Sequence, residues 1–145
     1  MSTNYDPWQD VVDNWPELDV VLEPMDGDLL GTVEWPVIAI RASSSPAQQR
    51  CTLAHELIHL ERGIRDCGPW ADREELAVHS EVARRLIPIE RLAEAVAELG
   101  GSEPRGALAG LLHVDTETVD LRLSLLDRRE RRLVRARAGK RWQAA

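Results

Sequence analysis

His55-Glu56-Leu57-Ile58-His59 is an H-E-x-x-H motif within a run of residues that predicts an α-helix. At about 100° per residue the two histidines lie about 40° apart, so both imidazoles leave one face of the helix a single turn apart. Two imidazole nitrogens placed in this way can bind one Zn²⁺ ion at about 2.0–2.1 Å. Glu56 lies about 100° further round, too far to bind the ion comfortably but close enough to take a proton from a water molecule beside it. The motif therefore predicts a zinc site with His55 and His59 as ligands and Glu56 as general base.

The residues around the motif strengthen this prediction. Thr52-Leu53-Ala54 before it and Leu60 after it are mostly apolar, which indicates that the helix is buried on nearly all sides. An uncompensated polar group costs several kilocalories when it is buried, so two histidines and a carboxylate in such a helix need a partner. The alternative is a chance match, with two structural histidines beside a solvated glutamate.

Length, charge and cysteine content limit the class of protein. The chain has 145 residues and a formal net charge of −7, long enough for one domain with an appended helical subdomain. No apolar run approaches the length of a membrane span, and the N-terminus has neither a basic start nor an apolar core. Two cysteines, Cys51 and Cys67, are too few for a disulfide framework. We therefore expect a cytoplasmic protein with no membrane partner.

The segment that precedes the motif predicts a small sheet. A short helix is expected over residues 7–15, and alternating segments at residues 18–22, 29–33 and 37–42 predict three strands. Ser45 then marks the start of the active-site helix, which we expect to continue to residue 62. We interpret the fold class as α+β, with a small three-stranded antiparallel sheet packed on the H-E-x-x-H helix and an all-helical C-terminal half.

Both ends of the active-site helix carry recognisable signals. Ser45 can cap the first turn, Pro46 suits the first helical position, and Gln48 completes a capping box. Gly63 follows Arg62 and supplies the stop. Further helices are predicted over residues 72–87, 88–99 and 102–112 and from Asp115 onward.

A catalytic zinc ion needs a third protein ligand and an open position for water. The candidates are Cys51, Cys67, Glu74, Glu75, His79 and His113. Cys51 is eight residues from His59, about 12 Å along a helix axis, so one ion cannot hold both. Glu74 and Glu75 open the next predicted helix, and the order of an H-E-x-x-H helix, a loop and a glutamate lets two helices present His, His and Glu to one ion.

The stretch from Arg50 to Pro88 resembles the ImmA/IrrE family of zinc metallopeptidases, which is common in phages and mobile elements. The matching residues are R-C-T-L-A-H-E-L-I-H-L-E-R-G and D-R-E-E-L-A-V-H-S-E-V-A-R-R-L-I-P. The family's second motif is E-x-x-A-N-x-F-A-x-x-L-L-x-P, and anchoring it on Leu86-Ile87-Pro88 places its glutamate ligand on Glu75, with Glu74 one residue out of register. His79 stands at the family's asparagine, where it could orient a zinc-bound histidine or compete for the metal.

The resemblance implies a fold, a cofactor and a reaction. It implies a three-stranded sheet on the active helix, Zn²⁺ held by His55, His59 and Glu75, and hydrolysis of peptide bonds in a specific protein, a phage or mobile-element transcriptional repressor. Residues 1–100 would then form a zincin-like metallopeptidase domain, in the host cytoplasm if the chain is phage-encoded, and residues 101–145 a helical subdomain. The rival interpretation is a zinc-containing but non-catalytic regulatory protein that binds a repressor or associates with DNA.

The C-terminal subdomain has helix-turn-helix spacing, but its charges argue against sequence reading. The helix after Asp115 offers Glu117 and Asp120 on its exposed side with Arg122 as the only base, and carboxylates repel phosphates. A basic tail from residue 127 to 141 contains Arg128, Arg129, Arg131, Arg132, Arg135, Arg137, Lys140 and Arg141. Such runs are usually the solvated face of a helix, so we expect nucleic acid binding to be absent, or weak and confined to this tail.

Overall fold

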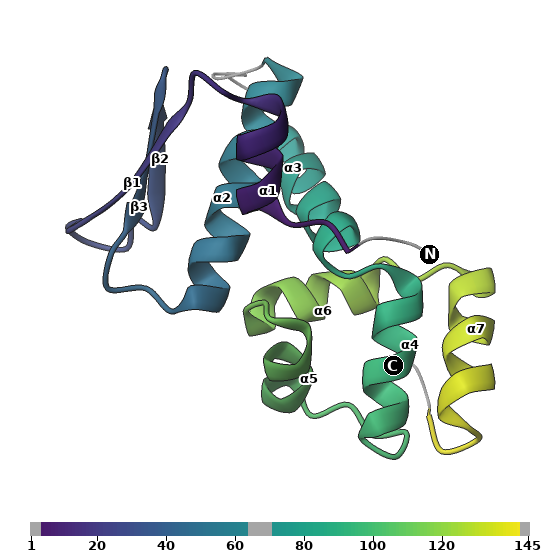
Figure 1. Cartoon of the computed structure of the whole chain (residues 1–145). Helices are drawn as coiled ribbons and strands as arrows, with labels where there is room; N and C mark the ends of the chain where they lie inside the picture. The colour runs from purple at the N-terminus through teal and green to yellow at the C-terminus, as the bar shows by residue number, and fades with distance from the viewer. Residues whose placement is uncertain (1–3, 64–70, 143–145) are drawn as a thin grey trace. The chain divides into compact units, whose positions relative to one another are not determined.

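The computed structural model describes residues 4–63 and 71–142 (Figure 1). The chain forms two compact units, Met1–Val78 and His79–Ala145, here called unit 1 and unit 2. The boundary falls inside helix α3, Ala71–Leu86, which contributes its first half to unit 1. The functional division expected at residues 100 and 101 remains a prediction.

Unit 1 contains one sheet and the predicted active-site helix. Its elements before α3 are α1 (Pro7–Asn14), β1 (Asp19–Glu23), β2 (Gly31–Glu34), β3 (Val37–Arg41) and α2 (Pro46–Arg62). In Figure 1 the three strands stand beside α2, and α1 also packs on that helix. The strands and α2 agree with the residue ranges predicted from the sequence to within one or two positions.

The sheet is mixed, so the expectation of an antiparallel sheet was wrong. Its strand order is β1-β3-β2, with β2 antiparallel and β1 parallel to β3. Ile38 of β3 lies opposite Val20 of β1 and opposite Val33 of β2. The chain leaves β1, passes to the far edge as β2 and returns through a tight turn as β3 between them. The chain reverses its direction between β1 and β2 and again in the hairpin between β2 and β3, so β3 runs parallel to β1.

The central strand carries the core of unit 1. Ile38 and Ile40 of β3 are buried against Leu53 and Leu57 of α2, and Leu18 closes the same cluster. Burying an aliphatic side chain of this size is worth about 1.5–3 kcal/mol. Helix α2 therefore packs on the sheet with the face that carries Leu53 and Leu57. The face that carries His55 and His59 is left to meet Glu75 of α3.

The ends of α2 confirm the predicted signals. The Ser45 side chain accepts a hydrogen bond from the Gln48 backbone amide, and the Gln48 side chain accepts one from the Ser45 amide. At the other end Gly63 has a φ of 70°, a left-handed conformation that glycine adopts without strain. These two caps fix the first and last residues of the helix. They therefore also fix the positions of His55 and His59 along its axis.

Unit 2 is helical throughout its described residues. After α3 it contains α4 (Ile89–Glu98), α5 (Arg105–Leu112), α6 (Thr116–Ser124) and α7 (Arg128–Ala138). Helix α4 packs on both α5 and α7, and α5 packs on α6. The basic segment, expected to be the solvated face of a helix, includes helix α7, which packs along α4 and exposes its arginines. Beyond it Trp142 is buried, and its Nε1 donates a hydrogen bond to Glu103 at 2.9 Å.

Helix α6 begins as predicted but exposes fewer basic groups than expected. Asp115 caps it by accepting a hydrogen bond from the Thr118 amide. Arg122 is only 3% exposed, so the expectation that it is a surface base was wrong. Its Nε donates to the Ile87 carbonyl at 2.8 Å and its Nη2 to Glu130 at 2.7 Å. Glu117 and Asp120 of α6 thus have no basic neighbour on the same helix, and Asp120 pairs instead with Arg105 of α5.

The architecture as a whole is α+β, as predicted. A small sheet of three strands is combined with seven helices among the described residues. None of these helices has the length and apolar character that crossing a membrane requires.

Candidate metal centre

Helix α2 delivers the three polar residues of the motif from a buried setting. Leu53 and Leu57 turn toward the sheet, and Glu56 is itself buried. His55 and His59 are partly buried, and their rings stand 4.6 Å apart between centroids at 83° to each other. The i, i+4 spacing therefore places both imidazoles on one side of α2, as predicted.

Glu75 of α3 meets both histidines. Its Oε1 lies 2.7 Å from His59 Nε2, and its Oε2 lies 3.1 Å from His55 Nε2. One carboxylate thus bridges the two imidazoles through the same ring nitrogen of each. Three groups from two helices are thus linked through the carboxylate of Glu75, and all three are types that bind zinc.

The kinds of donor group at this place suit a metal ion. With bonds of about 2.0–2.1 Å to a tetrahedral ion, ligand atoms lie about 3.3 Å from one another. The 3.1 Å contact of Glu75 with His55 is close to that separation, whereas the 2.7 Å contact with His59 is an ordinary hydrogen-bond distance. Two imidazoles and a carboxylate are the donor set of a catalytic zinc site, in which a fourth position stays open for water.

Glu56 is held next to this point and shielded from solvent. Its Oε1 lies 3.4 Å from His55 Nδ1, on the opposite edge of the ring from Glu75. A buried carboxylate without an arginine or lysine contact is costly, because the charge has lost its water. Glu56 thus has the burial and the position of a proton acceptor at the centre.

Gly31 is a residue of this site that sequence reasoning missed. A Cβ placed there would lie 2.4 Å from Thr52 Cγ2 and 3.6 Å from Glu56 Oε1. Strand β2 therefore approaches α2 more closely beside Glu56 than any residue with a side chain would allow. The available signal was a glycine inside a segment that alternates like a strand, which often marks a close approach of two backbones.

The carboxylates around His55 change its acid–base behaviour. Burial alone lowers the pKa of His55, but hydrogen bonds with Glu56 and Glu75 and the charges of those two groups more than offset this effect, so that its pKa is raised. In the metal-free protein the imidazolium form is stabilised by two flanking carboxylates. A metal ion would replace that proton as the positive charge between them.

The structure gives Glu74 and Glu75 different partners. Glu74 faces Arg62 at the end of α2, with 2.9 Å between its Oε2 and Arg62 Nη2 and a second contact from Arg62 Nε. The hydrogen bond from Arg62 is the main reason that the pKa of Glu74 is lowered. Glu74 therefore ties α3 to α2, while Glu75 faces the histidines. Which glutamate binds a metal remains a prediction, and this arrangement supports Glu75.

His79 lies one turn after Glu75 on the same continuous helix. One ligand atom each from His55, Glu75 and His79 can be chosen so that all three lie within 4.8 Å of one another. His79 is exposed, whereas the other two are partly buried. It is therefore placed either to join the metal or to accept a hydrogen bond beside it, the two roles left open by the sequence.

The remaining candidate ligands from the sequence were Cys51, Cys67 and His113. Cys51 is buried within α2, as expected of a small packing residue. Cys67 lies outside the described residues. His113 caps the end of α5 in unit 2, with a φ of 55°.

Comparison with known proteins places this geometry in a family. A family model described as the IrrE N-terminal-like domain, Peptidase M78, matches residues 18–124, well beyond the stretch on which the resemblance was noted. The comparisons with curated proteins and with solved structures each found no match. The family is one of zincin-type peptidases, and its match extends from the sheet through the H-E-x-x-H helix and Glu75 into α6. The chain thus belongs to the Peptidase M78 family, the ImmA/IrrE peptidases, as predicted from Arg50 to Pro88.

Proposed function

We propose that this protein is a zinc metalloendopeptidase that hydrolyses peptide bonds of a specific protein substrate. The observation that carries the proposal is the meeting of Glu75 with His55 and His59 at 2.7–3.1 Å beside the buried Glu56. Membership of a peptidase family supports the reaction class. His55, His59 and Glu75 would hold the metal, and none of the three would then be free to act as a base.

Glu56 carries the proton chemistry in this proposal. A bound zinc ion would supply a Lewis acid that acidifies water and polarises the substrate carbonyl. Glu56 takes the proton from the attacking water, the water oxygen forms a bond to the carbonyl carbon, and Glu56 returns the proton to the departing amine nitrogen. Burial favours this role, because it keeps the carboxylate away from bulk water and beside the predicted ligands.

The substrate belongs to the proposal as well. The resemblance to ImmA/IrrE peptidases supports a transcriptional repressor of a phage or mobile element as the protein that is cut, with cleavage in the cytoplasm.

The metal part is tested by elemental analysis of purified protein. We expect about one zinc per chain in the wild type and almost none in the His59→Ala variant. Glu75→Ala should lose zinc, and Glu74→Ala, the matched control on the same turn of α3, should keep it. Zinc retained by Glu75→Ala and lost by Glu74→Ala would show that the third ligand is wrong.

The catalytic part is tested with Glu56→Gln. This variant should keep its zinc and its fold but cut a repressor substrate about 10²–10⁴-fold more slowly, because it has lost the general base. Glu61→Gln, a change of the same kind on the exposed end of α2, should cut at the wild-type rate. A protein that binds a repressor and zinc but gives no fragments by mass spectrometry, with or without Glu56, would instead be the non-catalytic regulator.

A further inference from the structure

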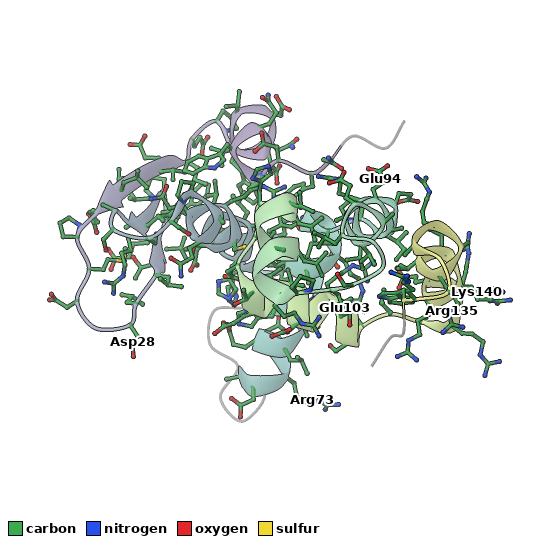
Figure 2. All side chains as sticks on the ribbon, turned by 90° about the horizontal axis from the view of Figure 1, so that it is seen from below. Asp28, Arg73, Glu94, Glu103, Arg135 and Lys140 are labelled. Carbon is green, nitrogen blue, oxygen red and sulfur yellow. The ribbon has the colours of Figure 1, made fainter. Side chains whose placement is uncertain are left out.

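Helix α7 has a buried side and a strongly basic exposed side. Val134 of α7 is buried, and so is Trp142, which lies beyond the end of the helix. Every arginine and lysine between residues 128 and 141 is exposed. Figure 2 labels Arg135 of α7 and Lys140, which lies just beyond the end of the helix. We define the arginine face of α7 by five of these exposed residues, Arg128, Arg129, Arg131, Arg132 and Arg135.

The arginine face covers a broad arc. At about 100° per residue its five side chains span about 160° of the helix circumference, on the side away from Leu133 and Val134. Along the axis, Arg128 and Arg135 are about 10.5 Å apart. Five positive charges are thus concentrated in two turns of one helix.

Within the described parts of the chain, no acidic side chain neutralises the positive charge of the arginine face. The two acidic residues of the segment are engaged elsewhere: Asp127 caps α7, and Glu130 completes the capping box and accepts a hydrogen bond from Arg122. Among the residues that the structure describes, no ion pair joins the arginine face to a carboxylate. A chain with a net charge of −7 holds enough acidic groups to pair these arginines, yet leaves them open to solvent.

The shape and composition of the arginine face favour one kind of negatively charged partner over the others. A membrane-binding helix exposes apolar residues, but the apolar side of α7 is turned into unit 2. An acidic helix of another protein would meet a narrow stripe, whereas an arc of about 160° suits a groove with negative charge on both walls. The major groove of B-DNA is about 12 Å wide, admits an α-helix and is lined on both sides by phosphates. Arginine, which outnumbers lysine here, binds phosphate oxygens in pairs.

We propose that the arginine face of α7 is a docking surface for duplex DNA, bound through its phosphates and without preference for base sequence. Over about 10.5 Å of axis a duplex carries about six phosphate charges, similar in number to the five arginines. Contacts to phosphates position a helix on the duplex but carry no information about base sequence. The acidic remainder of the chain limits the contact to this helix, so binding is weak at physiological salt and strong only below it.

Fluorescence anisotropy with a labelled random-sequence DNA duplex tests the proposal through its salt dependence. If all five arginines neutralise a phosphate, the slope of log affinity against log salt is about −4.5. Affinity should then fall about 500-fold between 50 and 200 mM salt. The double variant Arg131→Gln/Arg135→Gln should lower the slope to about −2.7, because two counterions fewer are released.

The matched control changes two exposed arginines of α3. Arg73→Gln/Arg84→Gln alters the net charge by the same amount but leaves the arginine face intact, so the slope should remain that of the wild type. Equal slopes for the two double variants would overturn the proposal, since binding would then follow net charge alone. As a folding control, both double variants should unfold at the same temperature as the wild type.

Three further results would overturn the assignment to DNA. Polyglutamate that displaces the duplex at equal charge concentration would identify an acidic protein as the partner. Self-association in sedimentation experiments that disappears in Arg131→Gln/Arg135→Gln would identify a second copy of this chain. A preference of more than about tenfold for one DNA sequence at constant salt would show base reading, which a phosphate contact cannot provide.

Discussion

Glu56 in unit 1 and Arg122 in unit 2 are both charged side chains buried within helices, yet their surroundings differ. Arg122 has a backbone carbonyl and a carboxylate as partners, and only its Nη1 has no hydrogen-bond partner among the described residues. Among the described residues no arginine or lysine forms an ion pair with Glu56, whose Oε1 lies 3.4 Å from His55 Nδ1. Arg122, whose charge has fixed partners, holds helices together. Glu56, which lies beside potential metal ligands, is the residue that we propose takes part in the chemistry.

The same contrast separates the two units. Unit 1 brings polar groups inward to one point, where His55, His59 and Glu75 meet. Unit 2 turns its charges outward along α7 and uses the buried Arg122 to join the end of α3, α6 and α7. Four substitutions or conditions test whether this division between chemistry and architecture is real.

The largest effect is expected from the removal of α7. A chain truncated after Leu126 loses Val134 and Trp142 from the core, so unit 2 should no longer unfold cooperatively. The single change Trp142→Ala should cost about 3–5 kcal/mol of unfolding free energy, measured by denaturant titration. Arg131→Gln/Arg135→Gln on the exposed side of the same helix should cost less than about 0.5 kcal/mol. A stable truncated chain would show that α7 is only a tail.

Loss of the buried arginine should come next. Arg122→Ala leaves the Ile87 carbonyl and Glu130 without their partner, which should cost about 3 kcal/mol of unfolding free energy. Arg84→Ala, an exposed arginine of α3, provides the control and should change stability by less than about 0.5 kcal/mol. Zinc content should remain that of the wild type, since no metal-binding residue is touched. A stability loss as small as that of the control would contradict the architectural role of Arg122.

A smaller effect is expected where β2 approaches α2. Gly31→Ala places a methyl group 2.4 Å from Thr52 Cγ2, so the strand or the helix must move, at a cost of about 1–3 kcal/mol. Gly31→Ala/Thr52→Ser removes the clashing methyl group and should recover most of that loss. Gly106→Ala in α5, where nothing lies within 4 Å of the added atom, should instead stabilise the protein by about 0.5–1 kcal/mol.

The smallest effect concerns pH. In metal-free protein the raised pKa of His55 means that its contribution to stability is full below the ordinary pKa of about 6.5 and is lost as the pH rises through the higher folded value. Chelator-treated wild type should therefore lose some unfolding free energy between pH 6 and 8. His55→Gln should lack this decrease, and His113→Gln should retain it.

Zinc should reverse the sign of that dependence. The metal needs a neutral imidazole, so bound zinc stabilises the fold more strongly as the pH rises. A zinc-loaded protein whose stability followed the same downward trend as the metal-free form would argue against His55 as a ligand.

Several features could be predicted from the sequence because their causes are local. The capping box of Ser45 and Gln48 and the stop at Gly63 involve residues at most three positions apart, and they fix α2. The i, i+4 spacing of His55 and His59 then dictates a shared side of the helix, whatever surrounds it. The family resemblance rested on the same short motifs, and the match to residues 18–124 confirms it.

Only the tertiary structure decided the features that depend on distant residues. The parallel pairing of Val20 with Ile38 requires β3 to enter between two earlier strands, which no periodicity reveals. Glu74 and Glu75 differ by one position, and only the packing of α3 on α2 turns one to Arg62 and the other to the histidines. Arg122 is buried because Ile87 and Glu130, 35 and 8 residues away, meet at its guanidinium group. Local signals set where helices begin and which residues share a face, whereas long-range packing sets what each face meets.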